Sequence, residues 1–188
     1  NTIKGFSDFI CNIEPDLIVV HGDRVEALAG AIAGSLNNFL VSHIEGGEIS
    51  GTIDELIRHA VSKMSHIHFV SNHDAAARLT QLGELKNSVH IIGSPDLDLM
   101  DPDKIPSLDF VKKYYDIPFD TFAIGMFHPV TTEVKETPQQ VHNLVNTLIK
   151  SKKKYILIYP NNDLGSNEII KEYKRLEKNK NFKIFPSL

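Results

Sequence analysis

The sequence predicts an α/β protein built from parallel βα units. Short runs rich in β-branched residues alternate along the chain with stretches of helical spacing. Residues 16–20 form a continuous apolar run, as expected of a strand covered on both faces of a parallel sheet. Polar, glycine-containing loops follow several of the predicted strands, and in open α/β sheets such loops carry the ligand sites. These observations together place the chain in the α/β class.

The composition is that of a folded soluble protein. Of the 188 residues, 41% are hydrophobic and 23% are charged, without the bias typical of disordered chains. Twenty-four acidic residues against 20 basic ones give a formal net charge of −4, and neither sign forms long blocks, so we expect no nucleic-acid partner. No apolar stretch approaches the roughly 20 residues of a membrane helix, so we expect no membrane partner and a cytoplasmic location. Because Cys11 is the only cysteine, intrachain disulfides and cysteine-rich zinc sites are excluded.

The first half contains four predicted strands and three predicted helices. A stripe of apolar residues makes the helix over residues 53–64 the clearest one, and Thr52 followed by Glu55 predicts a capping box at its start. Small residues in the preceding helix should let it lie close to the sheet. We expect strands at residues 16–20, 39–42, 66–70 and 89–92, and helices at 25–36, 53–64 and 74–82.

The second half repeats the same alternation. Gly93-Ser94-Pro95 breaks the first series, and the prolines and aspartates that follow indicate a domain junction near residue 100. We therefore divide the chain into residues 1–100 and 101–188. The second part has predicted strands at 121–127, 155–159 and 182–185, with a striped helix before the second strand and a charged helix over 167–178. The chain begins with asparagine and ends directly after a strand, so we expect a fragment that lacks both ends.

Polar residues cluster directly after the predicted strands. Asp23 and Arg24 follow the first strand, the loop at 43–48 follows the second, and His128 and Asn161 follow two strands of the second half. Ligands bind beyond the carboxyl ends of parallel strands, where loops are free of sheet hydrogen bonds and helix N-termini point toward the ligand. This coincidence predicts a ligand site.

Several of these residues also have purely structural interpretations. Asp23, with Glu26 three residues later, is a plausible N-cap pair. Asp54 lies in the first turn of its helix, where any carboxylate is favoured by the helix dipole. Arg58 follows Asp54 by four residues, so the two could form an ordinary contact on the helix surface.

Glu45 is the strongest functional candidate. It lies in a glycine-rich loop where the backbone can approach a ligand closely. By contrast, His66 and His68 alternate on one strand face without matching carboxylates nearby, so we interpret them as core or edge histidines and predict no metal site. The lysines at 152–154 are interpreted as a solvated face.

Four motifs in the chain agree in order and spacing with one known family. They are His-Gly-Asp-Arg at 21–24, a long segment from His43-Ile44-Glu45 to Arg58-His59, His-Pro-Val-Thr-Thr at 128–132, and Pro-Asn with Asp and Gly-Ser at 160–166. With these motifs the sequence resembles the hydrolysing UDP-N-acetylglucosamine 2-epimerases of sialic-acid biosynthesis. Arg24 and the double-glycine loop of Glu45 look like the hydrolysing branch, as opposed to related enzymes that release an epimerised UDP-sugar.

The resemblance implies a glycosyltransferase-B-like fold with two Rossmann-like domains and the sugar nucleotide in the cleft between them. Residues 1–100 would be the later part of the N-terminal domain and 101–188 the earlier part of the C-terminal domain. The family's first strand with its glycine-containing loop, and a later Gly-Asn-Ser-Ser loop that grips the diphosphate, have no match here. We therefore expect the isolated chain to bind UDP poorly and to have little or no activity. The full-length protein is expected to be a homo-oligomer, a dimer or a tetramer.

The implied reaction converts UDP-N-acetylglucosamine and water to N-acetylmannosamine and UDP, without a cofactor. A carboxylate removes the C2 proton as UDP leaves C1, and water then adds to the resulting glycal. Carboxylates gathered around one site should raise the pKa of at least one of them. The resemblance implies catalytic roles for Asp23, Glu45, Asp54 and His128 and substrate-binding roles for Arg24, His43, Arg58 and Asn161.

Three alternatives stay open on the sequence. The first is the same reaction on a UDP-2,4-diacetamido-trideoxyhexose of the legionaminic acid pathway, because that epimerase shares the fold and the motifs. The second is a glycosyltransferase of the same architecture, which the Glu45 loop argues against. The third is a sugar-nucleotide-binding module without turnover.

Overall fold

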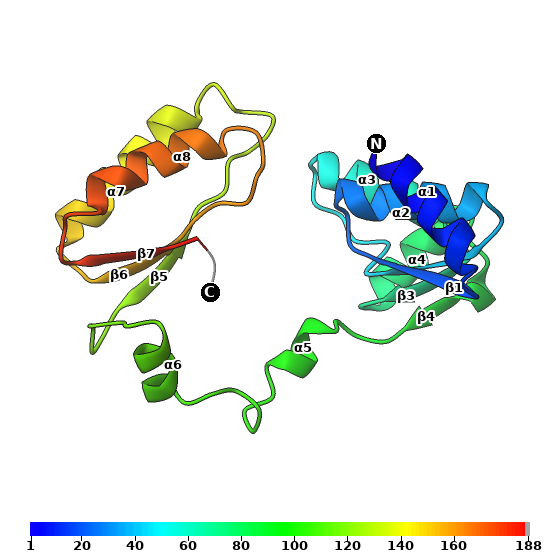
Figure 1. The fold of residues 1–188 in the computed structure, drawn as a ribbon, viewed down its shortest axis with the longest axis horizontal. Coiled ribbons are helices and arrows are strands. Elements are labelled where there is room, and N and C mark those ends of the chain that lie inside the picture. Colours follow the sequence, from blue (N-terminus) through cyan, green and yellow to red (C-terminus); the bar gives the residue numbers. More distant parts are fainter. Residues whose placement is uncertain (187–188) are drawn as a thin grey trace. The chain divides into compact units, whose positions relative to one another are not determined.

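The computed structural model describes residues 1–186, which divide into two compact units. The first unit spans Asn1–Ile105, and the second begins at Pro106. Each unit contains one parallel sheet with helices packed on it (Figure 1). Within the described part of the chain, no helix is long and apolar enough to cross a membrane.

The first unit is built on a four-stranded sheet with the strand order β1-β2-β3-β4. In the register, Val20 pairs with His43, and His43 pairs with His68. The carboxyl ends of β1, β2 and β3 therefore meet at one edge of the sheet. The strands are β1 (Leu17–His21), β2 (Leu40–Ile44), β3 (Ile67–Val70) and β4 (Val89–Ile91), and the main helices are α1 (Thr2–Ile13), α2 (Val25–Leu36), α3 (Ile53–Lys63) and α4 (His73–Gln81).

The four main helices of the first unit, α1 to α4, lie on one face of its sheet (Figure 1). The strands follow one another in chain order, and right-handed crossovers between them place every connecting helix on the same side. As a result, Ile18 and Val20 of β1 are buried, whereas Val19 between them is 57% exposed. The expectation that this strand is covered on both faces is therefore wrong for this chain.

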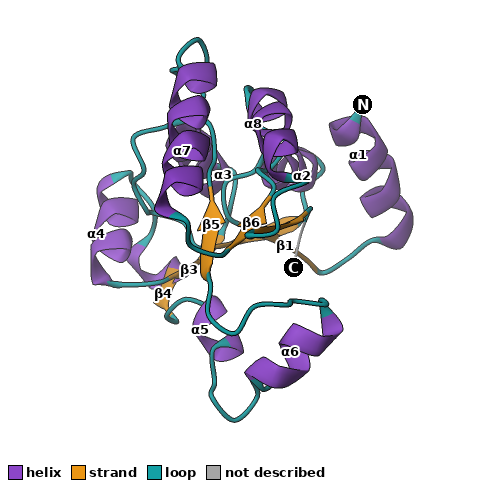
Figure 2. Ribbon diagram, turned by 90° about the vertical axis from the view of Figure 1, so that its left-hand side faces the viewer, coloured by secondary structure: helices purple, strands orange, loops and turns teal. Residues whose placement is uncertain are grey.

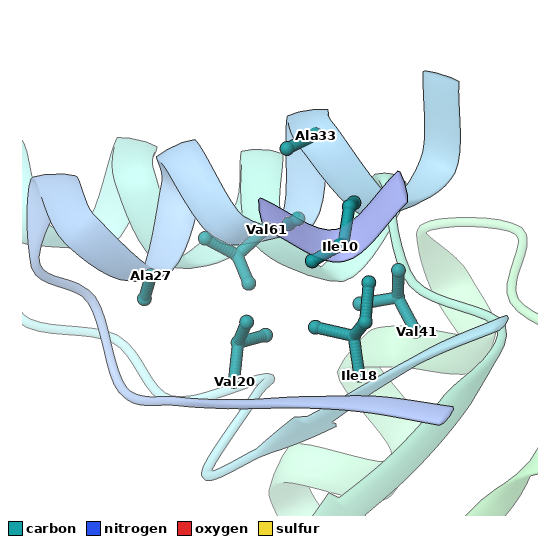
Figure 3. Close-up of a cluster of buried hydrophobic side chains, with 8 residues drawn as sticks. Ile10, Ile18, Val20, Ala27, Ala33, Val41 and Val61 are labelled. Atoms are coloured by element: carbon teal, nitrogen blue, oxygen red, sulfur yellow. The ribbon is translucent and has the colours of Figure 1, made fainter. Parts of the chain in front are cut away.

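The core of the first unit lies between α1, α2, α3 and the covered face of the sheet (Figure 3). A Cβ on Gly34 of α2 would lie 2.6 Å from Cγ2 of Val41 and 2.8 Å from Cδ1 of Ile18. The absence of a side chain at this position is what lets α2 approach the strands, as the small residues of this helix predicted. The buried core side chains are Ile10, Ile18, Val20, Ala27, Ala31, Ala33, Val41 and Val61.

Two local features differ from the sequence-based expectation. The helix α1 was not predicted, although Phe6 packs against the core and Ile10 is fully buried in it. The capping box at the start of α3 is not formed, because the Thr52 side chain makes no cap hydrogen bond. Glu55 instead accepts hydrogen bonds from the backbone N–H groups of Ser50 and Gly51, at 2.8 and 2.7 Å.

The second unit has a three-stranded parallel sheet in the order β5-β6-β7. Its helices α7 and α8 pack against each other on one face of this sheet (Figures 1 and 2). Ile156 of β6 packs instead with Ile117 and Phe119 of the segment before β5. The strands are β5 (Ala123–Met126), β6 (Tyr155–Ile158) and β7 (Phe182–Phe185), and the helices are α7 (Thr137–Ser151) and α8 (Ser166–Tyr173).

Several short helices complete the described part of the chain, and sequence periodicity revealed only the last of them, which lies inside the helix predicted over 167–178. They are α5 (Asp96–Leu99), α6 (Leu108–Tyr114), and the 3₁₀ turns η1 (Lys86–Ser88) and η2 (Lys174–Leu176). Ser107 caps α6 by accepting a hydrogen bond from the Phe110 N–H group at 3.3 Å. Helices of one or two turns carry too few apolar positions for a recognisable stripe.

Candidate active site

Asp23 lies in the turn after β1 and is bound by Arg58. The carboxylate forms an ion pair with the Arg58 guanidinium, which also donates a hydrogen bond to the Glu48 carbonyl oxygen at 2.9 Å. Arg58 is only 8% exposed although it carries a charge, so its two protein partners replace water. The N-cap role considered for Asp23 does not hold, because Arg24 is the N-cap residue of α2. The helix-surface contact considered for Arg58 does not hold either, because Arg58 reaches across to Asp23.

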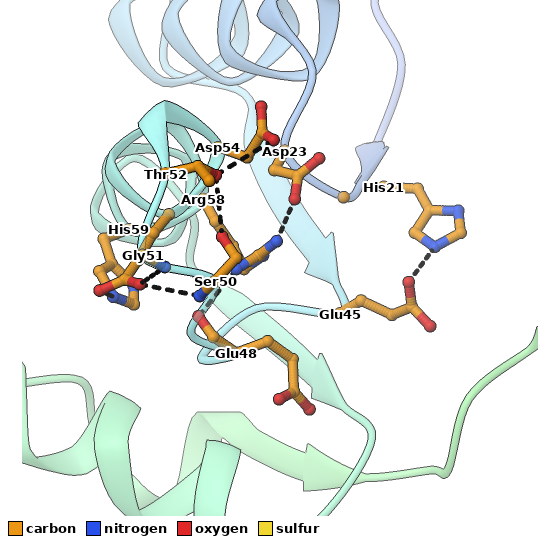
Figure 4. A network of polar contacts seen from close by, with 12 residues as sticks. His21, Asp23, Glu45, Glu48, Ser50, Gly51, Thr52, Asp54, Arg58 and His59 are labelled. Carbon is orange, nitrogen blue, oxygen red and sulfur yellow. Dashed lines mark hydrogen bonds and ion pairs between the residues drawn. The ribbon is translucent and has the colours of Figure 1, made fainter. Parts of the chain in front are cut away.

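Glu45 lies just beyond β2, and both of its carboxylate oxygens have partners. Nε2 of His21 lies 2.9 Å from Oε2, and the Ser94 hydroxyl donates to Oε1 at 2.7 Å. Figure 4 shows the Glu45 carboxylate directed toward His21 and the Asp23 carboxylate directed toward Arg58. The hydrogen bond from Ser94, followed by that from His21, holds the pKa of Glu45 below its ordinary value against the opposing effect of burial. Glu45 is therefore not a carboxylate with the raised pKa that we expected for at least one of the clustered carboxylates.

The loop after Glu45 requires glycine at two positions for steric reasons. A Cβ on Gly46 would lie 2.9 Å from both Nδ1 of His43 and Oγ of Ser62. Gly47 has a φ of 81°, and a Cβ there would lie 2.5 Å from the Ala75 carbonyl oxygen. Glu45 itself has a φ of 65°, a left-handed conformation that is uncommon outside glycine. The double glycine therefore packs the loop tightly onto α3 and α4.

His43 has no exposed surface, and both of its ring nitrogens contact protein atoms. Nε2 lies 2.9 Å from the Gly22 carbonyl oxygen, and Nδ1 lies 3.0 Å from Oγ of Ser62. Burial lowers the pKa of His43 to about 4, so the ring is neutral near pH 7. Direct contact with substrate, which the resemblance implied, does not fit a side chain so enclosed.

Asp54 and Arg24 occupy the two helix N-termini next to this edge of the sheet. Asp54 is in the first turn of α3 and accepts a hydrogen bond from the Thr52 hydroxyl at 3.3 Å. Arg24 is the exposed N-cap residue of α2. Together with His21 it lines a hollow of about 490 Å³ beside β1.

In the second unit, the structure brings two predicted site residues together. His128 follows β5 and Asn161 follows β6, and Nδ1 of the ring lies 3.2 Å from Oδ1 of the amide. Both residues are exposed. Ser166 fixes the loop that carries Asn161, because its hydroxyl lies 2.6 Å from the carbonyl oxygens of Asn161 and Asp163.

Sequence reasoning missed three residues that contact the predicted site. His21 lies in the His-Gly-Asp-Arg motif, Ser62 is an inconspicuous position of α3, and Ser94 belongs to the Gly-Ser-Pro break after the fourth strand. Ser94 and Glu45 are 49 positions apart in the chain, so no local signal links them. No group of three or more His, Cys, Asp or Glu side chains in residues 1–186 is arranged to hold a metal ion.

Comparison with known proteins places the whole chain in one family. The model of the UDP-N-acetylglucosamine 2-epimerase family matches residues 1–188. The chain is 50% identical to UDP-N-acetylglucosamine 2-epimerase of Neisseria meningitidis serogroup B, covering all of this chain and 50% of that protein. It is 36% identical over 175 residues to UDP-N,N'-diacetylbacillosamine 2-epimerase (hydrolyzing) of Legionella pneumophila, covering 91% of this chain and 46% of that protein. The chain thus spans about half the length of these relatives.

Solved structures show the same fold. A crystal structure of UDP-GlcNAc 2-epimerase from Neisseria meningitidis bound to UDP-GlcNAc superposes with a TM-score of 0.79 at 19% sequence identity, covering 100% of this chain and 53% of that one. This likeness confirms the α/β fold of the glycosyltransferase-B kind with parallel sheets. Together with the family match over the full sequence, it shows that the chain belongs to the UDP-N-acetylglucosamine 2-epimerase family.

Proposed function

We propose that this chain is part of a hydrolysing 2-epimerase that converts UDP-N-acetylglucosamine and water to N-acetylmannosamine and UDP. Membership of the epimerase family supports chemistry at C2 of a UDP-sugar. The observation that carries the proposal is the set of carboxylates at the carboxyl edge of the first sheet, at Asp23, Glu45 and Asp54. Such an edge is where α/β proteins bind their ligands.

The proposed reaction has two stages. A carboxylate takes the proton from C2 while the bond between C1 and the diphosphate oxygen breaks, which gives a glycal and UDP. Water then supplies a hydroxyl group to C1, and a proton is delivered to C2 on the face opposite to the first abstraction. Each stage needs a positioned acid or base, because a C2 proton next to an N-acetyl group is only weakly acidic.

Glu45 is suited to act as a carboxylate and not as a proton donor. Two hydrogen bonds hold it, from the Ser94 hydroxyl and from Nε2 of His21, and they favour its ionised form. Asp23 is held at a fixed place by its ion pair with the buried Arg58.

The departing diphosphate requires cationic or hydrogen-bonding partners. We assign Arg24 and His128 to the diphosphate and Asn161 to the nucleotide, following the resemblance of their motifs. The contact of 3.2 Å between His128 and Asn161 supports a shared role for this pair. Arg58 is assigned to hold Asp23, since its guanidinium is already engaged by protein groups. We further propose that the complete protein is a homo-oligomer.

A second sugar is supported by a specific observation. The Legionella relative, at 36% identity, is named as an epimerase of UDP-N,N'-diacetylbacillosamine, which carries a second acetamido group. The same residues would perform the same C2 chemistry on that substrate. The groups that face positions 4 and 6 of the sugar would then decide between the two substrates.

The test is product analysis with the protein that carries this chain at the length of its relatives. It is incubated in heavy water with UDP-N-acetylglucosamine or UDP-N,N'-diacetylbacillosamine, and the free sugar is identified by NMR. Free N-acetylmannosamine with deuterium at C2 supports the main proposal. A released sugar from the second substrate alone supports the alternative. Binding of both without turnover would identify a sugar-nucleotide-binding module.

We also propose that the 188-residue chain alone is a poor UDP binder with little or no turnover. It spans about half the length of the relatives it matches, so groups supplied elsewhere in those proteins have no counterpart in it. Calorimetric titration with UDP measures this directly. Affinity tighter than about 1 μM, which corresponds to about −8 kcal/mol of binding free energy, would contradict it.

A further inference from the structure

The imidazole ring of His43 joins three segments of the first unit: its own strand β2, the turn after β1, and α3. Its Nε2 contacts the carbonyl oxygen of Gly22, in the turn after β1, at 2.9 Å. Its Nδ1 contacts the Oγ of Ser62, on α3, at 3.0 Å. A carbonyl oxygen only accepts hydrogen bonds, so Nε2 carries the proton and Nδ1 accepts from the Ser62 hydroxyl. A single neutral tautomer therefore satisfies both contacts.

These three segments carry the three carboxylates of the proposed reaction. Asp23 comes directly after the residue whose carbonyl His43 holds, and Glu45 comes two residues after His43 itself. Asp54 lies on the same helix as Ser62. The ring thus connects the supports of all three groups through two hydrogen bonds.

The ring has no room to take another position. It is fully buried, and Ser62 is fully buried as well. Gly46 closes one side of the ring, since a Cβ there would lie 2.9 Å from both Nδ1 and the Ser62 oxygen. Because the ring and its serine partner are both fully buried, the two hydrogen bonds define the position of the Gly22 carbonyl group and of the turn that follows it.

We propose that His43 is a positioning residue that fixes Asp23 relative to Glu45 and α3 through the Gly22 carbonyl and the Ser62 hydroxyl. The expected effect on turnover rests on the proposed function, whereas the expected effect on the position of Asp23 does not. His43 does not touch substrate in this account. Its effect on turnover comes from the placement of a carboxylate, since a displacement of about 1 Å can lower a rate about a hundredfold.

The test uses Ser62→Ala, because replacing His43 itself would leave a large cavity in the core. Val61→Ala is the matched control: Val61 is the preceding residue of α3, is also fully buried, and packs only in the apolar core cluster. Both variants are made in the protein that carries this chain at the length of its relatives. Turnover of UDP-N-acetylglucosamine is measured well below their unfolding midpoints, and ¹⁵N NMR reports the ring nitrogens of His43 and the amides of Gly22 and Asp23.

We expect Ser62→Ala to lower kcat about a hundredfold with little change in KM, and Val61→Ala to leave kcat near that of the unaltered protein. The His43 ring should show a protonated Nε2 and an unprotonated Nδ1. Equal kcat values in the two variants, or a proton on Nδ1 of the unaltered protein, would overturn the proposal.

The two proposals fail in distinguishable ways. If the unaltered protein turns over neither UDP-sugar, the proposed function is wrong. The NMR data then decide the role of His43 on their own. In that case, amide shifts of Gly22 and Asp23 that change in Ser62→Ala and not in Val61→Ala support positioning. Spectra of these amides that are unchanged in both variants refute it.

Discussion

Nε2 of His21 lies 2.9 Å from Oε2 of Glu45, so the last residue of β1 contacts the first residue after β2. The two strands are neighbours in the parallel sheet, and their register places the two residues at the same edge. Ser94 completes the arrangement by donating to the other oxygen at 2.7 Å. Glu45 is therefore a carboxylate whose charge and orientation are both set by the fold.

Replacing Glu45 or Asp23 by the matching amide should lower turnover by at least about a hundredfold, as expected for the loss of a proton-transfer group. The substitutions Glu45→Gln and Asp23→Asn keep the side-chain shape and remove the charge. Steady-state kinetics with UDP-N-acetylglucosamine measure the effect. Glu177→Gln, at an exposed position of the second unit, is the control. Unchanged turnover in either variant would remove that residue from the mechanism.

Removing the Ser94 hydroxyl should move the acidic limb of the pH profile of kcat/KM to higher pH. The hydrogen bond from Ser94 is the largest influence that lowers the pKa of Glu45, so Ser94→Ala brings this pKa back toward its ordinary value. If Glu45 acts as the base, it then becomes protonated at a higher pH, and kcat/KM falls at a higher pH as well. Ser88→Ala is the control, because its exposed hydroxyl bonds only to a nearby carbonyl group. A limb that does not move would exclude Glu45 as the titrating base.

His43 should remain neutral down to about pH 4. Its folded-state pKa of about 4 lies below the ordinary value of about 6.5, so the unfolded chain binds more protons between these two pH values. The free energy of unfolding therefore decreases as the pH falls from about 6.5 to about 4, by roughly 3 kcal/mol from this group.

Burial lowers the pKa of His68 as well, which adds to the loss of stability in the same direction. Urea unfolding at several pH values measures the sum, and NMR titration of each ring separates the two histidines. A His43 ring that titrates near 6.5 in the folded protein would contradict the prediction.

Arg58→Lys should destabilise the first unit by about 1–2 kcal/mol and lower turnover. One guanidinium donates both to Asp23 and to the Glu48 carbonyl oxygen, and a single ammonium group cannot reproduce this planar geometry. Arg175→Lys is the control, because Arg175 also donates to two side chains, those of Glu172 and Asn146, but does so at the surface, with its side chain 39% exposed. The control should change the unfolding free energy by no more than about 0.5 kcal/mol. Equal unfolding free energies of both variants in urea would show that the paired contacts of the Arg58 guanidinium contribute nothing specific to stability.

Gly47→Ala should be far more destabilising than Gly51→Ala. Both glycines have positive φ values, 81° and 67°, so both variants should lose about 1–2 kcal/mol from backbone strain. Only Gly47 lacks space, because its Cβ would meet the Ala75 carbonyl oxygen at 2.5 Å, whereas nothing lies within 4 Å at Gly51. The additional loss at Gly47 should be about 1–3 kcal/mol, measured as a difference in unfolding free energy. Similar losses in the two variants would mean that the loop shifts freely away from α4.

Local pattern was sufficient to predict most of the fold. The apolar runs of the strands and the stripe of α3 are properties of consecutive residues, so the parallel βα order could be read directly. At α2 the predicted range of 25–36 is the same as the observed range of Val25–Leu36. The helix α1 was missed although Phe6 and Ile10 face the core, because Gly5 and Ser7 weaken the helical pattern. The resemblance, carried by motifs at the strand ends, led to the family that the comparisons confirm.

The partners of the site residues were decided by packing across the chain. Arg58 had a carboxylate four residues away in sequence, yet it binds Asp23, which is 35 positions distant. Sequence spacing also could not reveal that His43 is enclosed, because its burial depends on α3 and on the glycine loop together. The same holds for Ser94, which follows β4 and contacts Glu45 because β4 and β2 belong to the same sheet.

The sequence alone therefore determined the α/β class, the strand order in the chain and the polar residues that follow each strand, because periodicity and turn chemistry act between near neighbours. The tertiary structure decided which donors hold each carboxylate and which histidine is removed from solvent. Those outcomes depend on side chains that meet across the sheet, where burial makes an unpaired polar group costly and increases the effect of each partner on its charge.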